Sequence, residues 1–339
     1  MKAVFVQGPG DLAVVDRDSP SPGAGEAVVR IVAAGICASD VGVFEGFNPI
    51  AVYPLTPGHE CIGVVETAPE GAAVRPGDRV TVYPSVGCGT CPACLAGRYN
   101  HCPTFKVIGI SRDGGIFAER VAIPVAQLLP VPDGLGELES ALIEPTAVAV
   151  HVNRRAAAVL GSRVVVIGTG VIGTLVAQVA RAYEASRVVV VDRMESRRSF
   201  LADLGFDHFV RADEGPLADG LRAHLEAADV VFDCVCANGT VDAALDLLAP
   251  GGKLVMVASP HGEHHLDLPF AKVYRRELSL IASRNYVPDD FREAMRLLAE
   301  GAVKTEPLVT GVWPLAEFGA AYADLKAHPD RHLKVLLKP

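Results

Sequence analysis

The second half of the chain alternates continuously apolar runs with amphipathic segments. The run RVVVI at Arg163–Ile167 is apolar after its first residue, as expected of a parallel strand that is covered on both faces. Val171–Ala182 then has the spacing of a helix, and a second buried strand is predicted at Arg187–Val191. This strand–helix–strand pattern predicts an α/β fold with a doubly wound parallel sheet.

The rest of the pattern differs between the two halves of the chain, since one part has strands alternating with helices and the other has short apolar runs. Further strands are predicted at Val230–Val235, Leu254–Val257 and Leu278–Ala282, and further helices at Ala147–Leu160, Glu195–Leu204, Val241–Leu248 and in FREAMRLLAE before Gly301. The first part, to about residue 140, is instead rich in Pro and Gly and broken into short apolar runs, which predicts a β-rich, partly barrel-like domain. The tail from about Asn285 is too short to fold alone, so we expect it to return to that domain.

Composition and charge exclude several classes of protein. A chain of 339 residues, half of them hydrophobic and 21% charged, predicts about two globular domains. Its formal net charge of −9, without clusters of Lys or Arg, argues against nucleic-acid and anionic-membrane partners. No apolar run reaches the roughly 20 residues of a membrane span. The opening MKAVFVQGPG has no apolar core of a signal peptide, so we expect a cytoplasmic protein.

Four cysteines fall within one short segment, CGTCPACLAGRYNHC. Cys88, Cys91, Cys94 and Cys102 have the spacing C-x₂-C-x₂-C-x₇-C, which suits four thiolates around a structural Zn²⁺ in a lobe of about residues 86–104. A disulfide framework is disfavoured by the expected reducing compartment. A bacterial ferredoxin cluster would close its spacing after three residues. Unconnected thiols remain the plain alternative.

A glycine-rich turn directly follows the first buried strand and opens the next helix. The motif is Gly168-Thr169-Gly170-Val171-Ile172-Gly173, whose glycines permit a tight turn and close approach of a pyrophosphate to the helix N-terminus. Asp192 ends the second strand, where a carboxylate accepts from the adenosine ribose and repels a 2′-phosphate. NAD is therefore favoured over NADP, although Arg193, Arg197 and Arg198 could soften that preference. The alternative is glycines that serve turns and packing alone.

A second set of metal-ligand residues lies on predicted turns of the first domain. Cys37 is in GICASD, His59 and Glu60 are in PGHECIG, and Glu144 is in LIEPTAVAVH. A thiolate, an imidazole and a carboxylate leave one zinc position open for water or substrate. Taken singly, Cys37 could be a buried hydrophobe, His59 a core histidine and Glu144 a helix first-turn residue. Cys234 and Cys236, on a predicted buried strand, are interpreted as packing residues.

These motifs, together with RPGDRV and GGIFAERVAIP, follow one another in the order of a known family. The chain resembles the zinc-dependent medium-chain dehydrogenases of the alcohol dehydrogenase superfamily, in the branch of sorbitol, polyol and sugar-acid dehydrogenases. The resemblance covers nearly the whole chain. It implies a GroES-like catalytic domain of residues 1–146 and 285–339, and a Rossmann domain of residues 147–284 inserted between its parts.

The resemblance also assigns roles to single residues. Cys37, His59 and Glu144 match ligands of the catalytic zinc, and Glu60 matches a neighbouring acid that ligates directly or through water. Ser39 matches the hydroxyl that takes the substrate proton, and Asp40 matches the carboxylate that orients the ligating histidine. Gly42 stands where several relatives carry a histidine, which leaves the route of proton exit open.

The activity implied is NAD-linked oxidation of a secondary alcohol to a ketone, with zinc as Lewis acid. Arg284 and Asn285 follow the last predicted sheet strand, and an arginine there suits a substrate carboxylate or hydroxyls; Arg284 could equally be an interface residue. We therefore expect a polyol, sugar or aldonate substrate. A threonine-, simple-alcohol- or formaldehyde-type dehydrogenase and a non-catalytic nucleotide-binding protein are the alternatives. The family also implies a homotetramer or homodimer.

Overall fold

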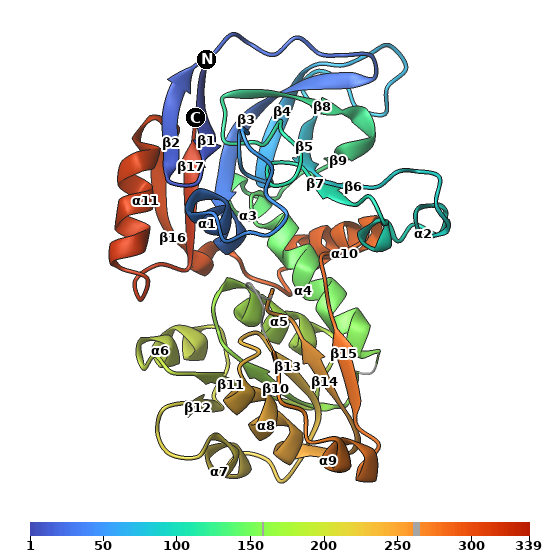
Figure 1. Ribbon diagram of the computed structural model, residues 1–339, viewed down its shortest axis with the longest axis vertical. Helices are drawn as coiled ribbons and strands as arrows, with labels where there is room; N and C mark the ends of the chain where they lie inside the picture. The colour runs from blue at the N-terminus through green and yellow to red at the C-terminus, as the bar shows by residue number, and fades with distance from the viewer. Residues whose placement is uncertain (158, 260–264) are drawn as a thin grey trace. The chain divides into compact units, whose positions relative to one another are not determined.

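The chain folds into two compact units in a computed structural model that describes residues 1–157, 159–259 and 265–339. Unit 1 comprises Met1–Glu144, Val287–Ala299 and Thr305–Pro339, and unit 2 comprises Pro145–Tyr286 and Glu300–Lys304. Both ends of the chain therefore belong to unit 1 (Figure 1). In the described ranges, no helix combines the length and the apolarity needed to traverse a lipid bilayer.

Unit 1 is built on a mainly antiparallel sheet of seven strands, in the order β16-β17-β3-β4-β5-β9, with β8 also paired to β3. Its strands are β1 (Lys2–Gly8), β2 (Asp11–Asp16), β3 (Glu26–Ile36), β4 (Glu60–Thr67), β5 (Arg79–Val82), β6 (Ser85–Val86), β7 (Lys106–Val107), β8 (Arg120–Pro124), β9 (Leu128–Pro130), β16 (Val309–Pro314) and β17 (Lys334–Lys338). Its helices are α1 (Ala38–Glu45), α2 (Pro92–Leu95), α3 (Glu137–Ser140), α10 (Pro288–Ala299) and α11 (Phe318–Ala327).

The tail of the chain completes this unit. Strand β17 pairs antiparallel with β3, so that Leu336 lies opposite Gly35. Phe318 of α11 packs edge-on against Phe44 of α1, with ring centroids 5.5 Å apart, and both rings are buried in the core of the unit. The apolar face of the tail is thus covered by the first domain, as expected for a segment too short to form a core of its own.

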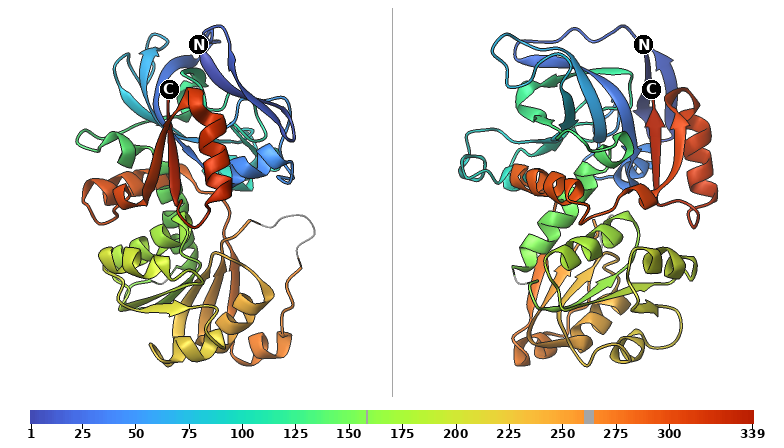
Figure 2. Two further views of the ribbon diagram at one scale, coloured as in Figure 1. Left: turned by 90° about the vertical axis from the view of Figure 1, so that its left-hand side faces the viewer. Right: turned by 180° about the vertical axis from the view of Figure 1, so that it is seen from behind.

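Unit 2 is a parallel sheet of six strands with helices on both faces (Figure 2). The strand order is β12-β11-β10-β13-β14-β15, which reverses between β10 and β13, where open α/β sheets bind their ligands. Its strands are β10 (Arg163–Ile167), β11 (Arg187–Asp192), β12 (Phe209–Arg211), β13 (Ala228–Asp233), β14 (Leu248–Met256) and β15 (Ser279–Ala282). Its helices are α5 (Val171–Ala182), α6 (Ser196–Asp203), α7 (Leu217–Arg222), α8 (Asn238–Leu247) and α9 (Phe270–Arg275), with α4 (Ile143–Ala156) at the boundary.

Two predicted elements end earlier in the structure. Helix α4 begins at Ile143 and ends at Ala156, because Ala157 has a left-handed φ of 55°; Ala158, within the predicted helix, lies outside the described residues. Strand β13 ends at Asp233, whose carboxylate accepts the backbone N–H groups of Val235 and Cys236. The interpretation of Cys234 and Cys236 as residues of a buried strand is therefore wrong, since both lie in the turn that follows it.

Candidate metal centres and nucleotide site

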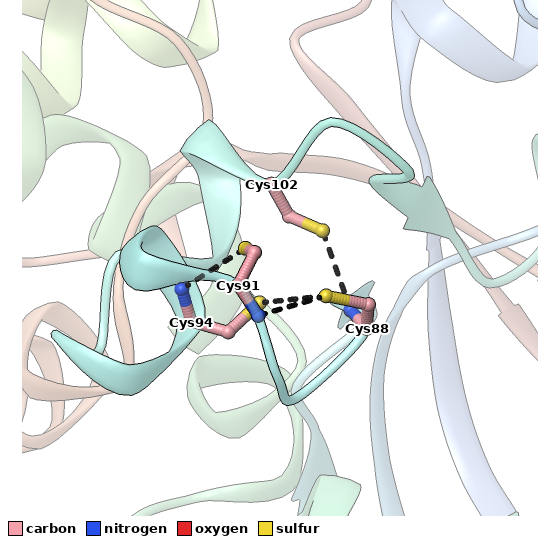
Figure 3. A group of neighbouring side chains, drawn as sticks. All are labelled: Cys88, Cys91, Cys94 and Cys102. Carbon is pink, nitrogen blue, oxygen red and sulfur yellow. Dashed lines mark hydrogen bonds between the residues drawn. The ribbon is translucent and has the colours of Figure 1, made fainter.

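The four cysteines of the segment CGTCPACLAGRYNHC lie together in a lobe of unit 1 (Figure 3). Cys91 caps the N-terminus of the short helix α2, Cys94 lies within it, and Cys88 and Cys102 flank it in the chain. One ligand atom from each side chain lies within 4.8 Å of the others, and the Cys88 and Cys94 sulfurs are 4.0 Å apart. The predicted gaps of two residues thus bring the thiols to one centre.

This geometry fits a closed zinc shell. Four sulfurs at about 2.3 Å from a central zinc require separations similar to those seen here. Backbone N–H groups of Cys88, Cys91 and Cys94 donate to sulfurs of the same set at 3.3 to 3.4 Å. Hydrogen bonds from the Thr90 hydroxyl and from backbone amides lower the pKa of Cys88 to about 5, so its thiolate is formed at neutral pH.

A second, buried group joins Cys37, His59 and Glu60. One ligand atom from each side chain lies within 4.8 Å of the other two. Cys37 is the N-cap of helix α1, and Glu60 is the first residue of strand β4, preceded by His59. His59 is 4% exposed and Glu60 1%, whereas Cys37 is partly exposed, so the group is largely buried but accessible on the side of its thiol. A thiolate, an imidazole and a carboxylate match a catalytic zinc site that keeps a coordination position open.

Asp40 contacts two members of this group, Cys37 and His59. One of its carboxylate oxygens accepts the Cys37 N–H at 2.8 Å, and the other lies 3.3 Å from His59 Nδ1. His59 Nε2 faces the Ser39 hydroxyl at 3.4 Å. Burial lowers the pKa of His59, but the Asp40 carboxylate and the Cys37 side chain outweigh it and raise that pKa well above the usual value. The surroundings of His59 therefore favour a positive charge, such as a bound cation.

Lys334, which sequence reasoning missed, binds Glu60. Its ammonium group donates to the two Glu60 carboxylate oxygens at 2.9 and 2.7 Å and to the Ile36 carbonyl at 3.1 Å. Burial lowers the pKa of Lys334, but attraction to Glu60 and other nearby acids outweighs it and raises that pKa. The only signal in the sequence was a lysine at the start of the apolar run KVLLK.

Gly35 makes room for this arrangement. It lies opposite Glu60 in the pairing of β3 with β4, and a side-chain carbon at Gly35 would overlap the Glu60 carboxylate. The fourth predicted ligand, Glu144, is buried in the first turn of α4. Among the described residues, Glu144 does not belong to the group whose ligand atoms lie within 4.8 Å of one another. Its role as a zinc ligand therefore stays a prediction.

The glycine-rich turn of unit 2 lies between β10 and α5, at the carboxyl edge of the sheet. Gly168 has a φ of 85°, and a side-chain carbon at Gly173 would overlap the Gly168 carbonyl. At Gly170, the N-cap of α5, such a carbon would meet no atom within 4 Å. The turn therefore needs Gly168 and Gly173 for its own geometry, whereas Gly170 leaves open space that fits a close phosphate.

Asp192 is fixed beside this turn. The Thr169 N–H and hydroxyl donate to one Asp192 oxygen at 2.8 and 2.7 Å, and the Met194 N–H donates to the other at 3.0 Å. A carboxylate accepts about four hydrogen bonds, so Asp192 keeps room for a ribose hydroxyl on its second oxygen. The turn and Asp192, predicted as parts of one site, thus lie in contact.

The predicted arginines have different surroundings. Arg193 is exposed, Arg197 is buried, and Arg198 donates to Glu195 at 2.6 Å. Arg284, predicted to bind substrate, is exposed after β15, and Asn285 beside it has a left-handed φ of 52°. A substrate role for Arg284 and Asn285 stays a prediction.

Comparisons with known proteins agree with this geometry. Residues 23–133 match the alcohol dehydrogenase GroES-like domain, and residues 171–300 match the zinc-binding dehydrogenase family. The chain is 35% identical to L-galactonate-5-dehydrogenase of Escherichia coli K12, over 95% of this chain and 94% of that protein.

Two solved structures have the same fold. One is the short chain alcohol dehydrogenase RspB of Escherichia coli CFT073 complexed with NADH, with a TM-score of 0.93, 28% identity and coverage of 100% of this chain and 99% of that chain. The other is a candidate zinc-binding dehydrogenase of Sinorhizobium meliloti 1021 bound to NADP, with a TM-score of 0.92, 30% identity and coverage of 100% and 99%. The GroES-like and Rossmann fold predicted from the sequence is confirmed, and the chain belongs to the zinc-binding alcohol dehydrogenase family.

Proposed function

We propose that this protein oxidises a secondary alcohol of a sugar acid or polyol to the ketone, reversibly, with zinc and NAD. The observation that carries the proposal is the buried group of Cys37, His59 and Glu60, whose ligand atoms lie within 4.8 Å of one another. The 35% identity to a galactonate dehydrogenase over nearly the whole chain supports the substrate class.

Within unit 1, Cys37 and His59 would hold the catalytic zinc, with Glu60 or Glu144 as the carboxylate ligand. Zinc, when bound, supplies a Lewis acid that lowers the pKa of the substrate hydroxyl. Asp40 orients His59, and the Ser39 hydroxyl, 3.4 Å from His59 Nε2, takes the substrate proton. A side-chain carbon at Gly42 would lie 3.1 to 3.4 Å from the Phe47 ring and from Asn48 Cβ. Since Gly42 offers no imidazole, Ser39 is proposed to pass the proton on by another route.

Within unit 2, the turn Gly168–Gly173 would hold the pyrophosphate of NAD, and Asp192 the adenosine ribose. The open space at Gly170 and the fixed orientation of Asp192 support this. Bound NAD supplies the hydride acceptor. Residues 1–146 and 285–339 are accordingly proposed as the catalytic domain, and residues 147–284 as the nucleotide-binding domain.

A substrate panel tests the proposal directly. NADH formation by the zinc-loaded protein is measured on aldonates, alditols, threonine, formaldehyde and propan-2-ol. We expect the highest kcat/KM on an aldonate or alditol. Equal efficiency on propan-2-ol would contradict the substrate class, and the highest value on threonine or formaldehyde would favour the alternative dehydrogenases. No NADH from any alcohol by protein containing about two zinc ions per chain would contradict the activity itself.

Arg284 is proposed as the substrate residue that distinguishes acids from polyols. A guanidinium group binds a carboxylate in bidentate fashion, and a lysine does so less well. Arg284→Lys should raise KM for aldonates about tenfold and leave KM for alditols within about twofold. An equal change on both substrate classes would make Arg284 a structural residue.

We also propose a homodimer or homotetramer formed through the edge of the unit 2 sheet. Strand β15 ends the strand order, and Leu268, Phe270 and Tyr274 of the neighbouring segment are 43%, 75% and 72% exposed. An open strand edge beside exposed aromatic side chains is typical of a surface that pairs with a second copy. Sedimentation of a monomer at micromolar concentration would contradict this.

A reducing compartment, the cytoplasm, is proposed as the location. All eight cysteines of the chain are free thiols, and zinc requires the four lobe cysteines as thiolates. Detection of the native protein in an oxidising compartment with its lobe thiols disulfide-bonded would contradict this.

A further inference from the structure

A network of ion pairs lies beside Asp192 at the carboxyl edge of the unit 2 sheet. Asp192 ends β11 and is the register partner of Arg211, which ends β12. The Ala212 N–H donates to the Asp192 carbonyl at 2.9 Å, so the two strand ends are tied together. Glu195 precedes α6 at its N-cap. The network thus occupies the edge at which parallel sheets of this kind bind the adenosine ribose.

The guanidinium groups of this network are paired with carboxylates. Arg211 binds Asp213 in bidentate fashion, with N···O distances of 2.8 and 2.6 Å, and also donates to Glu195 at 3.2 Å. The Glu214 carboxylate lies 3.6 Å from the same guanidinium. Arg198 donates to Glu195 at 2.6 and 3.3 Å. Arg198 of α6 and Arg211 of β12 therefore donate their hydrogen bonds to acidic side chains.

The local balance of charge is acidic. Hydrogen bonds to Asp213 and Glu195 raise the pKa of Arg211, and Arg198 and Arg211 lower the pKa of Glu195. Glu195 and Arg211 are therefore both charged at neutral pH. This part of the edge carries four carboxylates, those of Asp192, Glu195, Asp213 and Glu214, and three exposed or partly exposed guanidinium groups, those of Arg193, Arg198 and Arg211. A dianionic 2′-phosphate would meet repulsion from the acids and would find Arg198 and Arg211 already paired with carboxylates.

We propose that Glu195 and Asp213 are positioning residues that select NAD against NADP, by holding Arg198 and Arg211 away from a 2′-phosphate. The proposal rests on the proposed function, because it requires a nicotinamide dinucleotide in unit 2. Similar structures bind NADH in one case and NADP in another, so local residues must set the choice. Asp192 acts on the ribose directly, whereas Glu195 and Asp213 act through the two arginines.

The decisive variant is Glu195→Gln with Asp213→Asn in the full-length, zinc-loaded protein. Both changes keep shape and remove charge, and each replaces two accepting oxygens by one, so the pairing of Arg198 and Arg211 with these side chains is weakened. Binding of ADP, 2′,5′-ADP, NADH and NADPH is measured by calorimetry and nicotinamide fluorescence. We expect about five- to tenfold tighter binding of 2′,5′-ADP and NADPH, with ADP and NADH within about twofold, since charge-assisted bonds to phosphate are partly screened at an exposed site.

Matched variants separate this effect from a structural one. Asp219→Asn removes the acid of another exposed ion pair of unit 2, that with Arg222 at 3.0 Å, and should leave all four affinities unchanged. Adding Arg211→Gln to the double variant should cancel most of the gain for 2′,5′-ADP. The gain should also shrink between 0.05 and about 0.5 M salt, because exposed charges are screened.

The outcomes distinguish this inference from the proposed function. Unchanged 2′,5′-ADP affinity in the double variant, with NADH binding intact, would overturn the inference. Glu195 and Asp213 would then have only a structural role, in linking α6 to β12. Tighter NADPH than NADH binding by the unaltered protein would overturn it as well. If the unaltered protein bound neither NADH nor NADPH, the nucleotide site of the proposed function would be contradicted instead. If the double variant does not fold, Glu195→Gln alone weakens the pairing of Arg198 and carries the same test.

Discussion

The two groups of metal-ligand side chains in unit 1 are built in opposite ways. The lobe takes Cys88, Cys91, Cys94 and Cys102 from one stretch of 15 residues, and the backbone hydrogen bonds to its sulfurs come from the same stretch. The buried group takes its members from two separate segments, the residue that caps the start of α1 and the residues at the start of β4. It is bound in addition by Lys334, 274 residues from Glu60 in the sequence.

This difference separates a site that the local chain can form from one that requires the folded domain. Four thiolates close a zinc shell, so the lobe offers no position for a substrate. The buried group mixes a thiolate, an imidazole and a carboxylate, and the carboxylate has a second partner in Lys334. We therefore expect changes in the buried group to act on chemistry, and changes in the lobe to act on stability.

The largest effect is expected from Cys37→Ala. Loss of a thiolate ligand should empty the catalytic site, because only His59 and Glu60 of the buried group would remain. Turnover should fall at least about a thousandfold, or about 4 kcal/mol of transition-state stabilisation, while zinc content drops from about two to one per chain. NADH titration should still give binding.

Cys61→Ala is the matched control for this variant. Cys61 is a buried thiol next to Glu60, and it belongs to neither group of ligands. Its replacement should keep both zinc ions and most of the turnover. Full turnover by the Cys37 variant would refute the catalytic assignment.

Lys334→Met should have the next largest effect, on stability. The Lys334 and Glu60 side chains are 3% and 1% exposed, and removal of one partner of a buried ion pair costs about 3 to 5 kcal/mol because the other charge is left unpaired. Urea unfolding followed by fluorescence of Trp313, the one tryptophan of the chain, measures the loss. Lys334→Arg keeps the charge and should retain most of the stability. Equal losses for Met and Arg would point to packing and not to charge.

The contrast between the two groups also shows what the sequence could predict. The spacing of the cysteines alone predicted that they meet, because gaps of two residues restrict where successive sulfurs can lie. Strand β10 and helix α5 have their predicted bounds, because a continuous apolar run and a glycine-rich turn are local signals. The short elements β12, α7 and α9 were missed, since three to six residues carry little periodicity.

The buried group could not be assembled from local signals. Their residue types made Cys37, His59, Glu60 and Glu144 a candidate zinc set, but each had a plain alternative, and the resemblance to a family supplied their roles. Lys334 was not predicted, because it meets its partner Glu60 only when β17 pairs with β3. No short segment of the sequence indicates that pairing. Gly35 escaped for a similar reason, since its lack of a side chain matters only opposite Glu60. Such contacts depend on the register between distant strands.

Asp40→Asn tests whether the support around the buried group acts on the metal. An amide cannot match the carboxylate that lies 3.3 Å from His59 Nδ1, and loss of such a partner weakens zinc binding about 10- to 100-fold. Competition with a chromophoric chelator should show this loss for one zinc only. Equal weakening of both zinc ions would mean that the variant disturbs the whole unit.

The smallest effect on turnover is expected from Cys94→Ser in the lobe. Cys94 is buried and its N–H donates to the Cys91 sulfur, so its loss opens the shell and releases one zinc. The remaining zinc should stay with Cys37 and His59, because the two groups share no residue, and turnover per folded chain should stay within about twofold. Thermal stability should fall and proteolysis within residues 86–104 should quicken, since the metal closes that loop. A loss of turnover as large as that of Cys37→Ala, at full retention of the second zinc, would show that the lobe supports catalysis directly and would remove the distinction between the two groups.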